Sequence, residues 1–315
     1  MKILYAATDT IAVPLLDALN KEGLVKAVFT APDKPGKRGK TLIPSPIKAR
    51  ALELGLDVYT PETLRTEARI LVKSLGVDTL LSFCYGRIFG PKFLSLFERT
   101  FNVHPSALPE YRGCAPIYAT ILNQKKEGAV SIQKIALGVD EGDIYAQLPF
   151  SLDGSETSFA LEERISKLVP DFVMDVLADL DLHPAKPQSG DPSYQMFISK
   201  EDGVLDFTKD AKTLHAQIRA CNPWPRASVS SCNGNLLFTG VYGSVFDVFE
   251  PCDGEKPGTV VCLDKRKGLK IATGNGYLYV NKILPPMKKE MDANSFVNGN
   301  KWIIGTVLGD VDENN

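Results

Sequence analysis

Phe101-Asn-Val-His-Pro-Ser-Ala-Leu-Pro-Glu-Tyr-Arg-Gly-Cys-Ala-Pro-Ile117 is the stretch from which the fold of this chain can be worked out. Asn102 and His104 stand two residues apart, so in a strand their side chains point to the same face. Pro105 and Pro109 forbid a long regular element after them, so the chain leaves the strand as a loop. In parallel α/β sheets the carboxyl ends of strands bind ligands. An amide and an imidazole can both donate to a developing oxyanion, so the pair predicts a reactive site.

A second segment supplies a carboxylate. Gly128-Ala-Val-Ser-Ile-Gln-Lys-Ile-Ala-Leu-Gly-Val-Asp-Glu-Gly-Asp-Ile144 alternates like a strand and breaks at Gly138, with Asp140 in the turn that follows. Asp140 is placed to orient His104 and to move protons. Taken one at a time these residues also have structural interpretations, because an aspartate before glycine is usually a turn residue. A single histidine at a strand end is likewise usually a satisfied structural group.

The start of the chain predicts the fold class. Lys2–Ala7 and Val25–Thr30 are apolar like strands, and Ile11–Leu24 between them has apolar residues at helical spacing. This β-α-β order predicts a parallel sheet with right-handed crossovers, hence a Rossmann-like α/β domain. Val77–Phe83 is apolar enough to be a central strand buried on both faces. A Gly-x-Gly-x-x-Gly motif does not follow the first strand, so dinucleotide binding is unsupported.

Other elements follow from local signals. Residues 31–46 are rich in proline and glycine, which predicts a loop without helix or strand. A proline at position 170 is expected to kink or divide the long helix that surrounds it. The remaining elements predicted for this part are helices from Ser45 to Leu54, Glu62–Leu75 and Thr157–Leu180, and strands Val58–Tyr59 and Tyr145–Ser151.

The linker-like stretch around 183–192 predicts two domains: residues 1–182, a linker at 183–204, and residues 205–315. After a helix at Ala211–Ala220, the second domain is expected to form a smaller OB-like β-barrel, because short strands alternate with glycine turns. OB folds often bind nucleic acid, but a barrel that only packs on the first domain fits the pattern equally well. The five strands predicted are Ala227–Ser231, Leu236–Tyr242, Gly258–Cys262, Gly268–Ala272 and Tyr277–Lys282.

Composition narrows the class of protein. The net charge of −2 gives no global basic field, although local basic patches remain compatible with it. The six cysteines form no Cys-x-x-Cys pair and no metal spacing, which favours reduced thiols, no metal and a cytoplasmic location. Cys114 lies near the expected site but has no base beside it. No signal peptide and no apolar run of ~20 residues for a membrane span is present.

The motif Asn-x-His-x-Ser-x-Leu-Pro-x-x-Arg-Gly, followed by Val-Asp-x-Gly-Asp, resembles the folate-dependent formyltransferases, and the similarity extends over nearly the whole chain. The resemblance implies an enzyme that uses 10-formyltetrahydrofolate as co-substrate, with no prosthetic group. It assigns Asn102 and His104 to oxyanion stabilisation and Asp140 to proton relay during direct attack by an amine. The folate-binding residues it implies are Tyr85, Gly86, Ile88, Ser106, Ala107, Leu108, Pro109, Gly138, Val139 and Asp140.

The resemblance is strongest to those members of the family that act on tRNA. It implies the α-amino group of methionyl initiator tRNA as acceptor, for translation initiation, and a monomeric state. The basic stretch with Lys34, Lys37, Arg38 and Lys40 resembles an insertion that these members use on the acceptor end of tRNA. By itself such a run of charges is more often a solvated loop.

Three other functions are compatible with parts of the sequence. A formyltransferase acting on glycinamide ribonucleotide would need no second domain. A sugar-amine N-formyltransferase would use the same folate donor and could share the second domain, but would have no use for the basic stretch. An RNA-binding protein that had lost catalysis would be expected to lack Asn102, His104 or Asp140, and all three are present.

Overall fold

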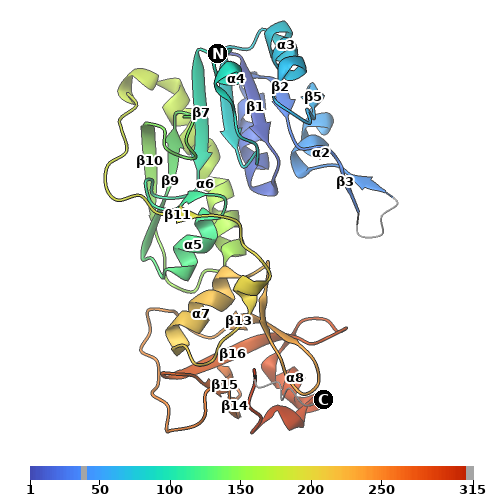
Figure 1. Cartoon of the computed structure of the whole chain (residues 1–315), viewed down its shortest axis with the longest axis vertical. Coiled ribbons are helices and arrows are strands. Elements are labelled where there is room, and N and C mark those ends of the chain that lie inside the picture. The colour runs from blue at the N-terminus through green and yellow to red at the C-terminus, as the bar shows by residue number, and fades with distance from the viewer. Residues whose placement is uncertain (37–40, 310–315) are drawn as a thin grey trace. The chain divides into compact units, whose positions relative to one another are not determined.

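The computed structural model describes residues 1–36 and 41–309 (Figure 1). Their contacts divide the chain into two units. The first comprises Met1–Pro116, Gly128–Phe150 and Glu162–Met196, and the second comprises Ile117–Glu127, Ser151–Leu161 and the chain from Phe197 on. The last crossing between them, after Met196, falls inside the predicted linker. No helix in the described ranges is both long and apolar enough to cross a membrane.

The first unit is built on a seven-stranded sheet with the order β10-β9-β7-β6-β1-β2-β5. The pairs β5–β2, β2–β1, β1–β6 and β6–β7 are parallel, and β9 runs antiparallel to β7. The predicted mostly parallel α/β sheet is therefore confirmed. Its strands are β1 Ile3–Ala7, β2 Val25–Phe29, β5 Val58–Tyr59, β6 Thr79–Phe83, β7 Arg99–His104, β9 Glu127–Gln133 and β10 Ile144–Ser151.

Alternation along β1 separates the helices onto two faces. Leu4 and Ala6 pack with Val72 of α3 and Phe93 of α4, whereas Tyr5 on the opposite face donates its hydroxyl hydrogen to Ala12 O (2.8 Å), just before α1. Ser45 caps α2 as predicted, accepting from Lys48 N (3.0 Å). The helices are α1 Val13–Lys21, α2 Pro46–Glu53, α3 Thr66–Leu75 and α4 Pro91–Leu94, with 3₁₀ turns at Thr10–Ala12 and Leu180–Leu182. Helix α5 (Pro116–Leu122) belongs to the second unit from Ile117 on.

Residues 31–46, which were predicted to form a loop without helix or strand, contain regular structure. Two short strands, β3 (Lys34–Pro35) and β4 (Leu42–Ile43), pair antiparallel and project from the sheet as a finger (Figure 1). Pro35 is tolerated because a two-strand ladder leaves one side of each strand unpaired. Gly36 N donates to Thr41 O (2.9 Å) and extends the ladder beyond the pair of Pro35 and Leu42. Lys34 is exposed on β3; the other three predicted tRNA-binding residues, Lys37, Arg38 and Lys40, lie outside the described residues.

The helix around Pro170 is not divided. It continues as α6, Ser158–Ala178, with Pro170 in its interior. An interior proline costs about 3 kcal/mol because a hydrogen bond is lost and the ring clashes with the preceding turn. The apolar stripe on both sides of the proline offsets this cost, since its members are buried along the length of the helix: Leu161, Ile165, Val169, Val173 and Val176.

The second unit is β-rich, as predicted. Its sheet has the order β12-β13-β16-β15-β14, with β17 paired to β16, and neighbouring strands pair antiparallel. Strands predicted at five places are present, and α7 (Ala211–Ala220) matches its predicted range. The strands are β12 Ala227–Val229, β13 Leu236–Val241, β14 Val260–Asp264, β15 Gly268–Ala272, β16 Tyr277–Leu284 and β17 Met291–Asp292. Helix α8 (Ala293–Gly299), which was not predicted, and 3₁₀ turns at Glu201–Gly203 and Lys301–Ile303 complete the unit.

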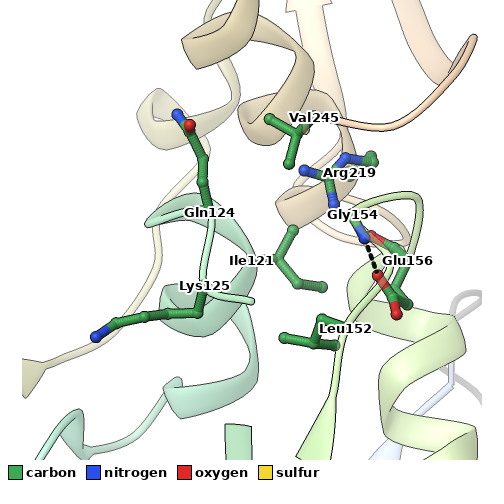
Figure 2. Close-up of a pocket in the computed structure, with 8 residues that line it drawn as sticks. All are labelled: Ile121, Gln124, Lys125, Leu152, Gly154, Glu156, Arg219 and Val245. Atoms are coloured by element: carbon green, nitrogen blue, oxygen red, sulfur yellow. Dashed lines mark hydrogen bonds between the residues drawn. The ribbon is translucent and has the colours of Figure 1, made fainter. Parts of the chain in front are cut away.

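Two basic side chains of α7 are buried in this unit. Arg219 donates through Nε to His215 Nδ1 (3.1 Å) and through Nη1 to Glu156 O (2.8 Å). Arg219 also borders a cavity of about 10 Å³, shared with Ile121, Leu152 and Val245 (Figure 2), which is room for one water molecule. Burial lowers the pKa of Arg219 to about 10, so the guanidinium stays charged at neutral pH.

Stability is expected to depend on pH through His215. Burial, and then the charge of Arg219, lowers the pKa of His215 from 6.5 to about 4. The unfolded chain therefore binds a proton at a higher pH than the folded chain does. The stabilising contribution of neutral His215 should be fully present above pH 6.5. The free energy of unfolding should then fall by about 3 kcal/mol as the pH drops from 6.5 to about 4.

Urea denaturation between pH 4 and 7.5 measures this dependence. His215→Asn is the matched variant, because its amide oxygen can still accept from Arg219 Nε but does not titrate. Its loss of stability on acidification should be smaller than that of the unaltered chain. Equal losses in the two proteins would contradict the assignment.

Candidate active site

The sheet places Asn102 and His104 at the carboxyl end of β7. In the pairing with β9, Asn102 lies opposite Gln133 and His104 opposite Ser131. The His104 side chain is 6% exposed, and that of Asp140 is 13% exposed. The three residues that the sequence singled out are thus brought together in one partly buried group, although they come from two segments of the chain.

Asp140 is the centre of this group. Its Oδ1 accepts from Asn102 Nδ2 (3.2 Å) and Gln133 Nε2 (2.8 Å), and its Oδ2 accepts from Gly113 N (2.9 Å). His104 Nδ1 lies 3.5 Å from the same Oδ2. Three donors fix the direction of the carboxylate, so Asp140 faces the imidazole in a defined orientation.

The imidazole of His104 is held from its other side. Nε2 lies 2.9 Å from Tyr111 O. A carbonyl oxygen can only accept, so Nε2 carries a hydrogen. Nδ1, which faces Asp140, is therefore the ring nitrogen left for chemistry. Asn102 uses one amide hydrogen on Asp140, and its second amide hydrogen is not needed for that bond.

The loop after β7 is held to the sheet by buried hydroxyl groups. Ser131 Oγ donates to Ser106 O (2.6 Å), and Ser106 Oγ donates to Glu110 O (2.6 Å). Gln147 Nε2 donates to Leu108 O (3.0 Å). Four of the sequence-predicted folate residues lie on this loop: Ser106, Leu108 and Pro109 are buried, and Ala107 is half-buried.

The remaining predicted folate residues lie on two other loops. Tyr85 is buried and its ring stacks on Phe89, with centroids 5.6 Å apart. Gly86 has φ +76°, and a Cβ at this position would have no neighbouring atom within 4 Å. Ile88 and Val139 are 76% and 43% exposed, and Gly138 precedes Val139. Both loops therefore present apolar side chains to solvent.

Cys114 does not have the properties of a nucleophile. Burial and the charge of Asp140 raise the pKa of its thiol. A thiol with a raised pKa is less ionised at neutral pH, and the thiolate is the reactive form. The structure thus agrees with the interpretation that Cys114 lacks an activating base.

Two glutamines at the site were not among the sequence-predicted residues. Gln133 lies two residues after Ser131 on β9, so both side chains point to the same face of the sheet. A prediction that β9 pairs with β7 would have placed Gln133 opposite Asn102 and so identified it. Gln188 Nε2 donates to Asp140 O (2.8 Å) and to Gly142 O (2.9 Å). Gln188 lies in the predicted linker, 48 residues from Asp140, where no local pattern marks it.

Comparison with known proteins gives matches over both parts of the chain. The formyl transferase family matches residues 1–177, and the formyl transferase C-terminal domain matches residues 197–301. The methionyl-tRNA formyltransferase of Borreliella afzelii is 33% identical over 314 residues, which is 99% of each chain. The methionyl-tRNA formyltransferase of Clostridium thermocellum has a similar fold (TM-score 0.56, 16% identity, 87% of this chain and 100% of that one).

An N-formyltransferase from Helicobacter canadensis, solved with folinic acid and dTDP-3-aminofucose, also has a similar fold. Its TM-score is 0.62 at 20% identity, over 89% of this chain and 98% of that one. At these identities the structural matches establish the fold alone.

Proposed function

The chain belongs to the formyl transferase family, and we propose that it transfers a formyl group from 10-formyltetrahydrofolate to the α-amino group of methionyl initiator tRNA. The observation that carries the proposal is similarity over the full length: relatives named methionyl-tRNA formyltransferase are 33–35% identical across 98–99% of this chain. Both domains are included in these matches. A monomeric state and a cytoplasmic location stay predictions from the sequence.

The residues around Asp140 suit a direct attack by the amine on the formyl carbon. A new C–N bond forms, and the carbonyl oxygen becomes an oxyanion. Asn102 Nδ2 donates to this oxyanion. His104 Nδ1 donates as well when the ring is in its imidazolium form, because Nε2 already carries a hydrogen toward Tyr111 O. A single donor of this kind typically contributes about 2.7–4 kcal/mol to transition-state stabilisation.

Collapse of the tetrahedral species breaks the bond between the formyl carbon and the folate nitrogen. The attacking amine must lose a proton, and the departing nitrogen must gain one. Asp140 moves this proton through water and keeps the His104 ring oriented. No covalent bond between the enzyme and either substrate forms in these steps.

The loops after β6 and β9 fit a flat, partly apolar donor. Gly86 leaves room for close approach of the backbone, and Ile88 and Val139 offer apolar contact. We propose that these loops, together with the loop from Ser106 to Pro109, hold the folate. Lys34, Lys37, Arg38 and Lys40 are proposed to contact the phosphates of the tRNA acceptor end.

A sugar-amine acceptor is the second candidate, because the Helicobacter canadensis enzyme shares the fold. The two functions differ in their need for the basic stretch. Formyl transfer from 10-formyltetrahydrofolate should therefore be measured with methionyl initiator tRNA, elongator methionyl-tRNA and an amino-sugar nucleotide. We expect transfer to the initiator tRNA alone; transfer to the sugar alone would replace the proposal by the second candidate.

The same assay tests the basic stretch. Changing Lys34, Lys37, Arg38 and Lys40 together to alanine should lower kcat/KM for initiator tRNA by about 10- to 100-fold and reduce its salt dependence. The KM for the folate should be unchanged. The control is Lys21→Ala with Lys26→Ala, two exposed lysines of the same unit. Equal losses in both variants would mean that general charge, and not this stretch, attracts the tRNA.

A further inference from the structure

We propose that Gln188 is a positioning residue that holds the catalytic Asp140 through its backbone. The inference rests on the proposed function and adds a residue to that site. Gln188 Nε2 donates to Asp140 O (2.8 Å) and Gly142 O (2.9 Å). Its Oε1 accepts from Arg112 Nε (3.2 Å) and Nη2 (2.8 Å). The side-chain amide thus uses both of its hydrogens and its oxygen to join two segments of the site.

The turn at Asp140 needs external support. Asp140 has φ +54°, a left-handed conformation that a residue with a side chain rarely adopts unless its surroundings hold it. The two carbonyl groups that Gln188 bonds bracket this part of the turn. Fixing them fixes the backbone from which the Asp140 carboxylate extends toward His104 and Asn102.

The chain around Gln188 is itself anchored to the site. Strand β11 (Tyr194–Gln195) pairs in parallel with β8 (Arg112–Gly113), and Gly113 N is a donor to Asp140 Oδ2. Ser193 Oγ accepts from Tyr111 N (2.9 Å), and Tyr111 O contacts His104 Nε2. The segment from Gln188 to Gln195 therefore supports the partners of both Asp140 and His104.

Two variants distinguish donation by Gln188 from simple packing. Gln188→Ala removes the donors and leaves the two carbonyl groups without them. Gln188→Glu keeps the size of the side chain and an acceptor for Arg112, but it turns a carboxylate oxygen toward the two carbonyl oxygens. If Gln188 acts by donating, the Glu variant should be at least as impaired as the Ala variant. If it acts by packing, the Glu variant should resemble the unaltered chain.

The experiment measures kcat and KM for formyl transfer to methionyl initiator tRNA in the full-length chain. Both Gln188 variants are expected to lose about tenfold or more in kcat, with the KM for the folate changed less than about threefold. Lys186→Ala is the control, since Lys186 is exposed and lies outside the segment from Gln188 to Gln195. It should keep the unaltered kcat, and thermal melts should show all variants folded.

A double-mutant cycle tests whether Gln188 works through Asp140. In an Asp140→Asn background, Gln188→Glu should cost less than about threefold in kcat, because the group it positions has already been disabled. If Gln188→Glu lowers kcat as much in the Asp140→Asn background as it does with Asp140 intact, the inference about Gln188 is wrong. It is also wrong if Gln188→Glu is unimpaired in a chain that is otherwise active. Neither outcome affects the proposed function. An unaltered chain without formyl transfer would overturn the proposed function, and the inference with it.

Discussion

Replacing Asp140 by alanine is expected to lower kcat for formyl transfer by about 10³-fold, with a change of less than about threefold in the KM for the folate. The carboxylate accepts from Asn102, Gln133 and Gly113 N and faces His104 Nδ1 at 3.5 Å. Its loss removes the proposed proton relay and also the group that orients both oxyanion donors. These effects act mainly on the transition state, so kcat should fall much more than substrate binding weakens.

Single-turnover rates with saturating substrates would measure this effect without a contribution from product release. Asp140→Asn separates charge from shape and should be impaired to a similar degree, because an amide cannot relay the proton as a carboxylate does. The control is Asp171→Asn, an exposed aspartate of α6 outside the motif. An Asp140→Ala variant with an unchanged single-turnover rate would remove Asp140 from the catalytic group.

Gly142→Ala is expected to have the largest combined effect on stability and activity. A Cβ at position 142 would lie 1.7 Å from Lys134 O and 2.7 Å from Lys134 C. These are backbone atoms just after β9, so no side-chain rotation can relieve the clash. The turn or the end of the strand must move, at a cost of about 3 kcal/mol. Either movement displaces Asp140, which lies two residues away, and separates Gly142 O from Gln188.

We expect Gly142→Ala to lower kcat by about 100-fold or more and the thermal midpoint by several degrees, on the order of 2–4 °C per kcal/mol. Gly299→Ala is the control, because a Cβ at position 299 would meet open space. Calorimetry and steady-state kinetics on the two variants measure both effects. A Gly142→Ala chain with normal stability and normal kcat would show that the close approach to Lys134 is not required.

The parts of the fold that local patterns encode were predicted from the sequence. Alternation put Asn102 and His104 on one face of β7, and the β-α-β order at the start predicted the parallel sheet. Ser45 before Pro46 marked the beginning of α2, and the glycine turns marked the strands of the second unit. In each case the signal lies within a few residues of the feature, so the physics that forms the element is visible in the local sequence.

The resemblance to formyltransferases supplied more of the site than the individual residues could. Asn102, His104 and Asp140, taken separately, each had a structural interpretation that was at least as probable. Their joint identity across two segments selected the catalytic interpretation. The structure then brought these three side chains into one group, while the roles of the individual folate and tRNA contacts stay proposals.

Only the tertiary structure decided which groups surround Asp140. Gly113 N and Gln188 reach it across 27 and 48 residues, and neither position carries a local signal of that contact. The same holds for Pro170, where burial on both sides of the proline keeps α6 undivided, and for the strands at the base of the basic finger. Such contacts depend on how distant segments pack, because a hydrogen bond between them forms only after the intervening chain has folded.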